Sequence, residues 1–489
     1  MASTWSALSN TMELLSGLFS LEDSPTTLDP GRRQCDQGTY VEELRRVIDK
    51  VESEGADSEA LDDIRQRLEE IEQEASKGLA VTVRHAVSGE VVAVVRARPT
   101  DTAAVLREGV LRETGDALVA LRFIHGSKVL KDSETLEEAG VQDGASVLVI
   151  RSPLKCLTAS FDGTSRVCQL GKGNAADDDK ASFMTESGPV MSAALSPCSG
   201  FVLVVCSGGD GCVRCASTGE LEFHLQGWVA SGEYSSNGQF ITGASDNGTA
   251  RIWCAKTGRC LHVLTGHTDD VKAAAFSPDA SLVATASCDS TAMICEASSG
   301  RTLLRLLGHA DVVRSVVFSQ DGKWVLTTSM DATARVWSAT TGECSQALRG
   351  HTKALSGAHF SSDGFRVLTA SFDGTVRVWD TLSGECLLLL PAENNVVNAA
   401  TFSPDGTSVL VASASESLRL FCADTGECRL TLSGHEDWVR VASFSPDGML
   451  VASGSYDGAA RIWSAVDGHC VQMLDGHAGA VIATAIAEA

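Results

Sequence analysis

Residues 350–390 read GHTKALSGAHFSSDGFRVLTASFDGTVRVWDTLSGECLLLL and contain four short runs rich in apolar and β-branched residues. Turn-forming groups separate these runs: SSDG, FDGT and LSGE. Short runs separated by turns of Gly, Asp and Ser are typical of the strands of an antiparallel sheet. This stretch therefore predicts one small four-stranded sheet.

The same unit recurs along the chain. Its Gly-His pair repeats at spacings of 42, 42, 84 and 42 residues, with the histidines at His267, His309, His351, His435 and His477. One small sheet cannot cover both of its own faces, whereas a ring of such sheets covers them and leaves few exposed edges. The repeat therefore predicts a mainly β protein whose largest part is a β-propeller.

These units resemble the WD40 family in their Gly-His pairs, in the turn aspartates and in the tryptophans of the third run. The resemblance implies a buried network that joins the histidine, a strand serine, the aspartate and the tryptophan. Three units hold all four residues: His309, Ser329, Asp331 and Trp337; His351, Ser371, Asp373 and Trp379; His435, Ser455, Asp457 and Trp463. Because the set recurs at a fixed spacing, we interpret it as part of the fold and not as a Ser-His-Asp catalytic triad.

The two ends of the repeat region complement each other. Residues 154–170 match the second and third strands of a unit that lacks its first strand, and residues 478–489 resemble a first strand without a successor. We therefore predict that residues 154–187 and 478–489 form one closing blade, in which His477 meets Ser160 and Asp162. Seven further units begin between residues 188 and 436, so we expect a propeller of eight blades over residues 152–489, with seven blades as the alternative.

Residues 79–151 follow another pattern. LAVTVRH and VVAVVRA predict a hairpin, a helix follows Pro99-Thr100-Asp101, and LVALRFI and VLVIR predict two more strands. This order is similar to ubiquitin, and a ubiquitin-like α+β domain in front of a propeller resembles the Notchless family in layout. Ser-Pro and not Gly-Gly follows Arg151, so we expect a docking module that is not conjugated. Its candidate contact residues are Phe123, Ile124, His125 and Lys128.

The first 78 residues differ in composition from the rest. Apolar residues at helical spacing over residues 40–78 predict a helical hairpin or a short coiled coil. Residues 1–39 are rich in Ser, Thr and Pro, and we expect them to be mostly disordered, with one amphipathic helix around Trp5 as an option.

Charge and hydropathy exclude several classes of function. The net charge is −24, and an acidic chain is repelled by phosphate backbones, so we expect no direct nucleic-acid partner. No apolar run reaches the roughly 18 residues of a membrane span, and no basic residue precedes the first apolar residues as in a secretory signal. We therefore expect no membrane partner and a location in the cytoplasm, the nucleus or both.

Five of the sixteen cysteines occupy one recurring repeat position: Cys260, Cys344, Cys386, Cys428 and Cys470. We interpret them as reduced, buried small hydrophobic residues. Cys212 and Cys215 form a CxxC pair without a second ligand pair, so we expect no metal site. Without a Gly-rich phosphate loop or paired carboxylates, we also expect neither a cofactor nor an enzymatic activity.

The expected function is therefore that of a protein–protein interaction scaffold or adaptor. The WD40 resemblance implies contacts at the face formed by the turns between second and third strands. Our candidate contact residues on that face are Phe161, Lys272, Arg314, Met330, Phe372, Trp438, Arg440 and Tyr456. Aromatic residues beside arginines favour an acidic or phosphorylated peptide. Two narrower alternatives stay open: a ribosome-assembly factor of Notchless-like layout and a substrate adaptor of the ubiquitin pathway.

Overall fold

The computed structural model describes residues 79–114, 118–130, 134–171, 180–184, 188–392 and 396–488, with only the backbone of residues 180–184. The chain divides into two units, Met1–Gly78 and Leu79–Ala489, and every described residue belongs to the second. The predictions made for residues 1–39 and 40–78 lie outside the described residues.

The first part of the second unit is a small α+β domain. Its sheet has the strand order β2-β1-β5-β3-β4, with β1 and β5 parallel at the centre. The elements are β1 (Leu79–His85), β2 (Val91–Ala97), α4 (Ala103–Thr114), β3 (Val119–His125), β4 (Lys128–Val129) and β5 (Ser146–Ser160). This order of two strands, a helix and further strands is the one that the sequence predicted.

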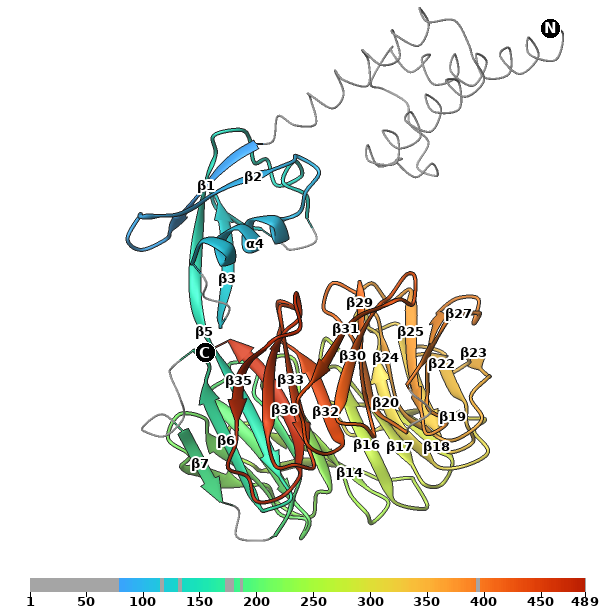
Figure 1. Ribbon diagram of the computed structural model, residues 1–489. Coiled ribbons are helices and arrows are strands. Elements are labelled where there is room, and N and C mark those ends of the chain that lie inside the picture. The colour runs from blue at the N-terminus through green and yellow to red at the C-terminus, as the bar shows by residue number, and fades with distance from the viewer. Residues whose placement is uncertain are drawn as a thin grey trace, which may run out of the picture. The chain divides into compact units, whose positions relative to one another are not determined.

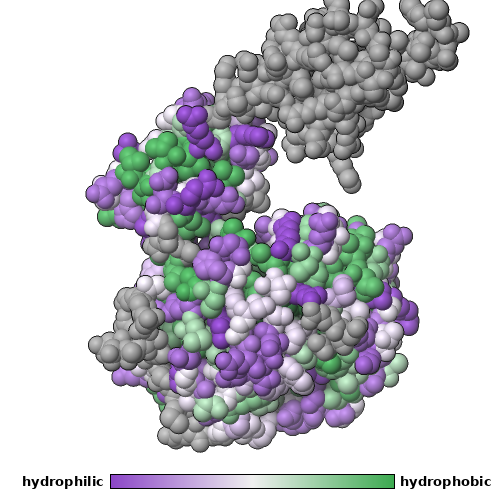
Figure 2. Space-filling view, viewed as in Figure 1, coloured by the Kyte–Doolittle hydropathy of each residue, from purple (hydrophilic) through white to green (hydrophobic). Residues whose placement is uncertain are grey.

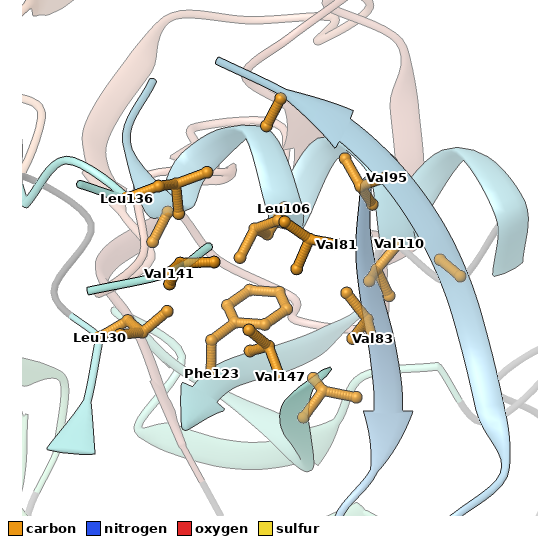
Figure 3. Packing of buried hydrophobic residues seen from close by; sticks show 14 of the residues in the cluster. Val81, Val83, Val95, Leu106, Val110, Phe123, Leu130, Leu136, Val141 and Val147 are labelled. Carbon is orange, nitrogen blue, oxygen red and sulfur yellow. The ribbon is translucent and has the colours of Figure 1, made fainter. Parts of the chain in front are cut away.

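Helix α4 covers one face of this sheet (Figure 3). Val81 and Val83 of β1 point to the same face because alternate residues of a strand share a side, and they meet Leu106 and Val110 of the helix. Gly109 permits the close approach of α4 to β2, because a Cβ atom at this position would lie 2.4 Å from Cγ2 of Val95. The core of the small domain thus lies between α4 and the sheet.

The repeat region forms seven four-stranded antiparallel sheets, each made of four consecutive strands (Figure 1). The first four sheets comprise β8 (Val190–Leu195), β9 (Phe201–Cys206), β10 (Gly211–Cys215) and β11 (Leu221–His224); β12 (Ser231–Tyr234), β13 (Phe240–Ala244), β14 (Ala250–Cys254) and β15 (Cys260–Leu264); β16 (Val271–Phe276), β17 (Leu282–Ser287), β18 (Thr291–Glu296) and β19 (Thr302–Leu307); β20 (Val313–Phe318), β21 (Trp324–Ser329), β22 (Ala334–Ser338) and β23 (Cys344–Leu348). The last three comprise β24 (Leu355–Phe360), β25 (Arg366–Ser371), β26 (Thr375–Asp380) and β27 (Cys386–Pro391); β28 (Val397–Phe402), β29 (Ser408–Ser413), β30 (Ser417–Cys422) and β31 (Cys428–Ser433); β32 (Val439–Phe444), β33 (Leu450–Ser455), β34 (Ala460–Ser464) and β35 (Cys470–Leu474).

The ends of the repeat region meet in one further sheet, which we call the closing sheet. It consists of the last strand β36 (Val481–Glu488), the second half of β5, β6 (Thr164–Gln169) and β7 (Lys180–Met184). Val481 lies opposite Ser160, and Glu488 lies opposite Leu154. The C-terminal segment therefore pairs with the segment that begins at residue 154, as the sequence predicted.

The closing sheet lies between the last and the first of the seven sheets, because β36 contacts β32 and β33 on one side and β8 on the other. The sheets together form a closed propeller, which we call the ring. The ring has seven blades that are each made of one continuous stretch of chain, which is the alternative to the expected eight, and the closing sheet joins the two ends of the repeat region between the last and the first of them.

Packing between neighbouring sheets explains the composition of the second strands. Every residue of β33 is buried, and so are five of the six residues of β17. A strand that is covered on both faces cannot alternate between apolar and charged residues, so these strands consist of small and apolar residues with buried hydroxyls. Each blade then shares its apolar faces with its neighbours, which is why a single blade has no separate core.

Candidate functional site

The blade that contains Trp337 holds a continuous hydrogen-bonded network. Nε1 of Trp337 donates to the hydroxyl of Thr327 over 2.8 Å, and Nε2 of His309 lies 2.8 Å from the same hydroxyl. Nδ1 of His309 lies 2.9 Å from Oδ2 of Asp331. Because the hydroxyl accepts from the indole, its own proton is free to go to Nε2, and Nδ1 then carries the proton that goes to the carboxylate. Every polar group in the network is satisfied.

Two other blades repeat this geometry. In the first, His351 lies 2.9 Å from Asp373 and 2.8 Å from Thr369, whose hydroxyl accepts from Trp379. In the second, the same contacts join the imidazole of His435, the hydroxyl of Ser453, the carboxylate of Asp457 and the indole of Trp463. The same geometry at three places in one chain indicates a structural element of the blade.

The strand serines that we expected in this network are not its bridging residues. The hydroxyl of Ser329 accepts the backbone N–H of Asp331 and donates to the carbonyl oxygen of Asp311. Ser371 and Ser455 make the same contacts with their own turns. Ser329 lies at the end of the second strand, beside the turn. Trp337 pairs with Val325, four residues before Ser329, so its indole N–H reaches the hydroxyl of Thr327 instead. The bridging residues are therefore Thr327, Thr369 and Ser453.

Burial and hydrogen bonding determine the charges in the network. Burial lowers the pKa of His309, although its contact with Asp331 acts in the opposite direction. Burial also acts to raise the pKa of Asp331, but hydrogen bonds from Thr333, Ala310 and His309 outweigh it and lower the pKa to about 2. The imidazole is therefore neutral and the carboxylate is charged near neutral pH. Since Thr327 is fully buried, its hydroxyl has no access to a substrate.

One blade and the closing sheet contain part of the network. His267 contacts Asp289 and Thr285, but Cys295 takes the position of the tryptophan. In the closing sheet His477 lies 2.9 Å from the hydroxyl of Thr158 and 2.8 Å from that of Thr164. The expected contact of His477 with Asp162 is present, with Nδ1 3.4 Å from Oδ2. Ser160 instead donates to the carbonyl oxygen of Gly479, because it lies at the turn like the other strand serines.

The prediction that the recurring cysteines are buried is wrong. Cys344, Cys386, Cys428 and Cys470 are exposed, and Cys260 is half-buried. Each of them begins the fourth strand of a blade, which is the outer edge of its sheet and has no neighbour beyond it. The cysteines of the described residues are all free thiols, and these residues contain no group of three or more His, Cys, Asp or Glu side chains placed to hold a metal ion.

The candidate contact residues of the ring lie at one end of the blades. Phe161, Met330, Phe372 and Tyr456 each follow a second strand directly, whereas Lys272, Arg314 and Arg440 are the second residues of first strands and Trp438 precedes one. In each antiparallel pair the start of the first strand lies opposite the end of the second strand. The two sets of residues are therefore at the same end of the blades. Trp438 is 55% exposed and Tyr456 is 43% exposed, so aromatic surface is available to a partner.

Several of these residues contact one another. The guanidinium carbon of Arg314 lies 5.4 Å from the centre of the Phe372 ring, which belongs to the next blade. The rings of Trp438 and Tyr456 meet edge to face with their centres 6.3 Å apart. Burial lowers the pKa of Arg314, and the positive charge of Arg440 lowers it further. Arg314 thus contacts the Phe372 ring and lies within the electrostatic influence of Arg440.

Lys272 does not add a free cation to this face. Its ammonium lies 3.1 Å from Asp270 and 3.4 Å from Asp246. The sequence does not reveal this compensation, because Asp246 belongs to the preceding blade, where no local pattern marks it as a neighbour of Lys272. We call Arg314, Phe372, Trp438, Arg440 and Tyr456 the arginine–aromatic cluster.

The candidate residues of the small domain are only partly accessible. Phe123 is 1% exposed, because the alternation of β3 points it into the core beneath α4 (Figure 3). Its assignment as a contact residue is therefore wrong. Ile124 and His125 are half-buried, and the exposed Lys128 pairs with Glu134. Exposed apolar side chains of this domain include Val91, Val94 and Val129, and Figure 2 shows hydrophobic residues at its surface among hydrophilic ones.

Comparison with known families agrees with both parts of this architecture. The model described as "WD domain, G-beta repeat" matches residues 215–254, 258–295, 300–338, 342–380, 384–422 and 426–464. The model of the ubiquitin family matches residues 81–154. The chain is therefore a WD40-repeat protein that carries a ubiquitin-family domain in front of its repeats. Each of the last five matched repeats begins near the fourth strand of one blade and ends with the third strand of the next, so each repeat joins two blades.

Two curated relatives show local similarity. The chain is 46% identical over 46 residues to "Meiotic recombination protein rec14" of Schizosaccharomyces pombe, which is 9% of this chain and 15% of that protein. It is 32% identical over 87 residues to "Ubiquitin domain-containing protein DSK2" of Saccharomyces cerevisiae, which is 18% of this chain and 23% of that protein. The chain thus spans less than a quarter of the length of either relative. Within the described residues, no helix has the length and apolar character needed to cross a membrane.

Proposed function

We propose that this protein is a non-catalytic adaptor that holds an acidic or phosphorylated peptide segment of a partner at the arginine–aromatic cluster. Three observations on one face of the ring carry the proposal: Arg314 lies over Phe372, the positive charge of Arg440 acts on Arg314, and Trp438 and Tyr456 form an exposed edge-to-face pair. Two neighbouring guanidinium groups repel each other, and an anion placed between them relieves that repulsion. The aromatic rings supply apolar contact area around it.

Peptide binding to the full-length protein tests this proposal. The probe is a fluorescein-labelled peptide with two phosphoserines between Asp and Glu residues, compared with the same peptide in which Ala replaces the phosphoserines. The variant Arg314→Ala/Arg440→Ala should weaken binding by about 100-fold or more, since it removes two charge-assisted hydrogen bonds that each contribute about 1.5–3 kcal/mol. Lys272→Ala is the matched control, because its ammonium is already paired with two aspartates, and it should leave the Kd within about twofold.

Equal affinity of the double variant and the unaltered protein would contradict the proposal. So would tighter binding of a single-stranded nucleic acid of equal charge, since the proposed ligand is a peptide. We also propose a cytoplasmic or nuclear location, which imaging of a fluorescently tagged chain would test.

A role in the ubiquitin pathway is the second candidate, and the ubiquitin-family match favours it. The domain has no free C-terminal tail, because β5 continues through Arg151 without interruption. We therefore infer that it acts as a non-covalent docking module. Purification of the tagged chain should recover ubiquitin-ligase or proteasome subunits under this proposal, whereas pre-ribosomal particles would instead favour the ribosome-assembly alternative.

A further inference from the structure

The ubiquitin-family domain and the ring share one strand without a linker. Strand β5 pairs with β3 from Leu148 to Pro153 and with β36 from Leu154 to Ser160. Strand pairing thus passes from one sheet to the other between two consecutive residues. Figure 1 shows β5 leaving the small sheet and entering the ring beside β6. A flexible tether would need unpaired residues between the two sheets, and β5 has none there.

The small domain also contributes to the core of the closing sheet. Ala120 of β3 is 3% exposed and belongs to the same buried cluster as Cys156, Leu450 and Ile486 of the ring. Leu118 packs against that cluster, and its Cβ lies 3.4 Å from the Cβ position of Gly171. Successive residues of a strand point to opposite faces of the sheet, so Ala120 faces away from the side of Phe123, which points into the domain's own core. One face of β3 therefore packs in the small domain and the other packs against the ring.

A buried ion pair crosses the same contact. Nη1 of Arg107, in α4, lies 3.2 Å from Oδ2 of Asp447, in the turn between β32 and β33, and the two side chains are 6% and 13% exposed. Removing one partner of such a pair leaves a buried charge without compensation, which makes the pair a strong constraint on the position of the helix. Arg122 and Glu488 form a second, more exposed pair.

The contact is not fully packed. A cavity of about 300 Å³ remains between the two bodies, bordered by Arg107, Arg122, Val129, Pro446 and Glu488. The apolar surfaces alone therefore do not fit closely, and the ion pairs and the shared strand determine the alignment. Asp447 and Tyr456 lie at opposite ends of β33, so the small domain contacts the end of the ring away from the arginine–aromatic cluster.

We propose that the ubiquitin-family domain is a clamp on the closing sheet: it holds β5 and β36 together, and it unfolds cooperatively with the ring. The closing sheet is the place where the two ends of the repeat region are joined only by hydrogen bonds and packing, so it is the point at which a ring of blades opens most easily. A clamp at this point stabilises the whole ring. This inference does not depend on the ligand proposed above.

The tryptophans allow a direct test in the full chain. All seven described tryptophans lie in the ring and none in the small domain, so the emission change on heating mainly reports unfolding of the ring. Arg107→Ala, a change in the small domain, should lower the midpoint of that transition by about 4 °C. The matched control is Arg112→Ala in the last turn of the same helix, which is exposed and should leave the midpoint unchanged. Arg107→Lys should restore part of the loss.

Hydrogen exchange identifies where the effect acts. Relative to the unaltered protein, Arg107→Ala should speed up exchange of the backbone amides of β36 and of residues 154–160. Exchange of the amides of β20 to β22, which lie in a distant blade, should change less. A ring transition that is identical in Arg107→Ala and in the unaltered protein, or a calorimetric trace in which the small domain melts separately from the ring, would overturn the proposal. Neither result would bear on peptide binding at the other end of the ring, so the two proposals fail independently.

Discussion

Two neighbouring blades, β24–β27 and β28–β31, have the same backbone and different chemistry. Leu355 pairs with Ser371 in the first blade as Val397 pairs with Ser413 in the second, and Trp379 pairs with Cys386 as Phe421 pairs with Cys428. The first blade holds the complete hydrogen-bonded network. In the second, Val411 stands where Thr369 stands, Phe421 replaces the tryptophan, and Ser415 replaces the aspartate.

The difference shows that the network is not needed to form a blade. The hydroxyl, the tryptophan and the aspartate of the first blade are all replaced in the second. The apolar replacements Val411 and Phe421 are each 3% exposed. Replacing both partners of a buried hydrogen bond by apolar groups is nearly neutral, whereas removing one partner leaves the other without a hydrogen bond in the interior. A blade therefore keeps its fold when several members of the network are replaced together, and the fold itself depends on apolar contacts between the sheets.

The largest effect should follow from breaking the network at its charged member. Asp373→Ala removes the acceptor of four hydrogen bonds, from His351, Thr352 and both the amide and the hydroxyl of Thr375. We expect the free energy of unfolding to fall by about 4 kcal/mol in urea titrations followed by tryptophan fluorescence. Ser415→Ala at the corresponding position of the next blade should change it by less than about 1 kcal/mol, and equal losses in both variants would contradict the comparison.

Glu233 offers a contrast, since it is a half-buried carboxyl outside the hydrogen-bonded networks of the blades. Its Oε1 accepts the backbone N–H of Phe276, which belongs to the next blade, and burial raises its pKa to about 7. Between pH 4.5 and 7 the unfolded chain loses a proton that the folded protein keeps, so this group reduces stability as the pH rises through that range. Glu233→Gln keeps the acceptor without the charge, and it should be more stable than the unaltered protein by about 3 kcal/mol at pH 8 and equally stable at pH 4. A difference that does not depend on pH would rule out this explanation.

A double-mutant cycle measures the coupling within the network. Thr369→Val leaves the indole of Trp379 and Nε2 of His351 without a partner and should cost about 2 kcal/mol. Trp379→Phe should then cost less in the Thr369→Val background than in the unaltered protein, because the indole N–H has already lost its acceptor. If the losses of stability in the two single variants add up in the double variant, the hydroxyl of Thr369 is not coupled to the indole of Trp379.

The smallest effect concerns the histidines. Burial lowers the pKa of His267, His309, His351 and His435 in the folded state. Below a pH of about 6.5 the unfolded chain therefore binds protons that the folded protein does not, and stability falls as the pH decreases. Each histidine should contribute on the order of 1 kcal/mol between pH 7.5 and 5.5. His435→Gln should show a shallower loss over this range, and an unchanged pH dependence would argue against neutral imidazoles in the fold.

The propeller could be predicted because its evidence is local. The spacing of Gly-His pairs and the four short runs of each unit repeat along the chain, and a repeated unit that cannot cover its own faces has few ways to fold. The pairing of residue 154 onward with the C-terminal segment could also be predicted, since each end lacks what the other supplies. The order of elements in the small domain followed from its alternating strands and from the turn before its helix.

Other features depended on distances that no local pattern records. The bridging hydroxyl of Thr327 differs from that of Ser329 only in how far the tryptophan ring reaches along the strand. The exposure of Cys386 depends on its sheet ending at the rim, and the pairing of Lys272 with Asp246 depends on how two blades are set side by side.

The sequence by itself determined that this protein is a ring of WD40-type blades preceded by a ubiquitin-like domain, because periodic burial leaves a periodic pattern in the residues. Only the tertiary structure decided that the two bodies share β5 and are held by Arg107 and Asp447, 340 residues apart. An ion pair between distant segments needs just one residue on each side, and a single residue does not create a pattern.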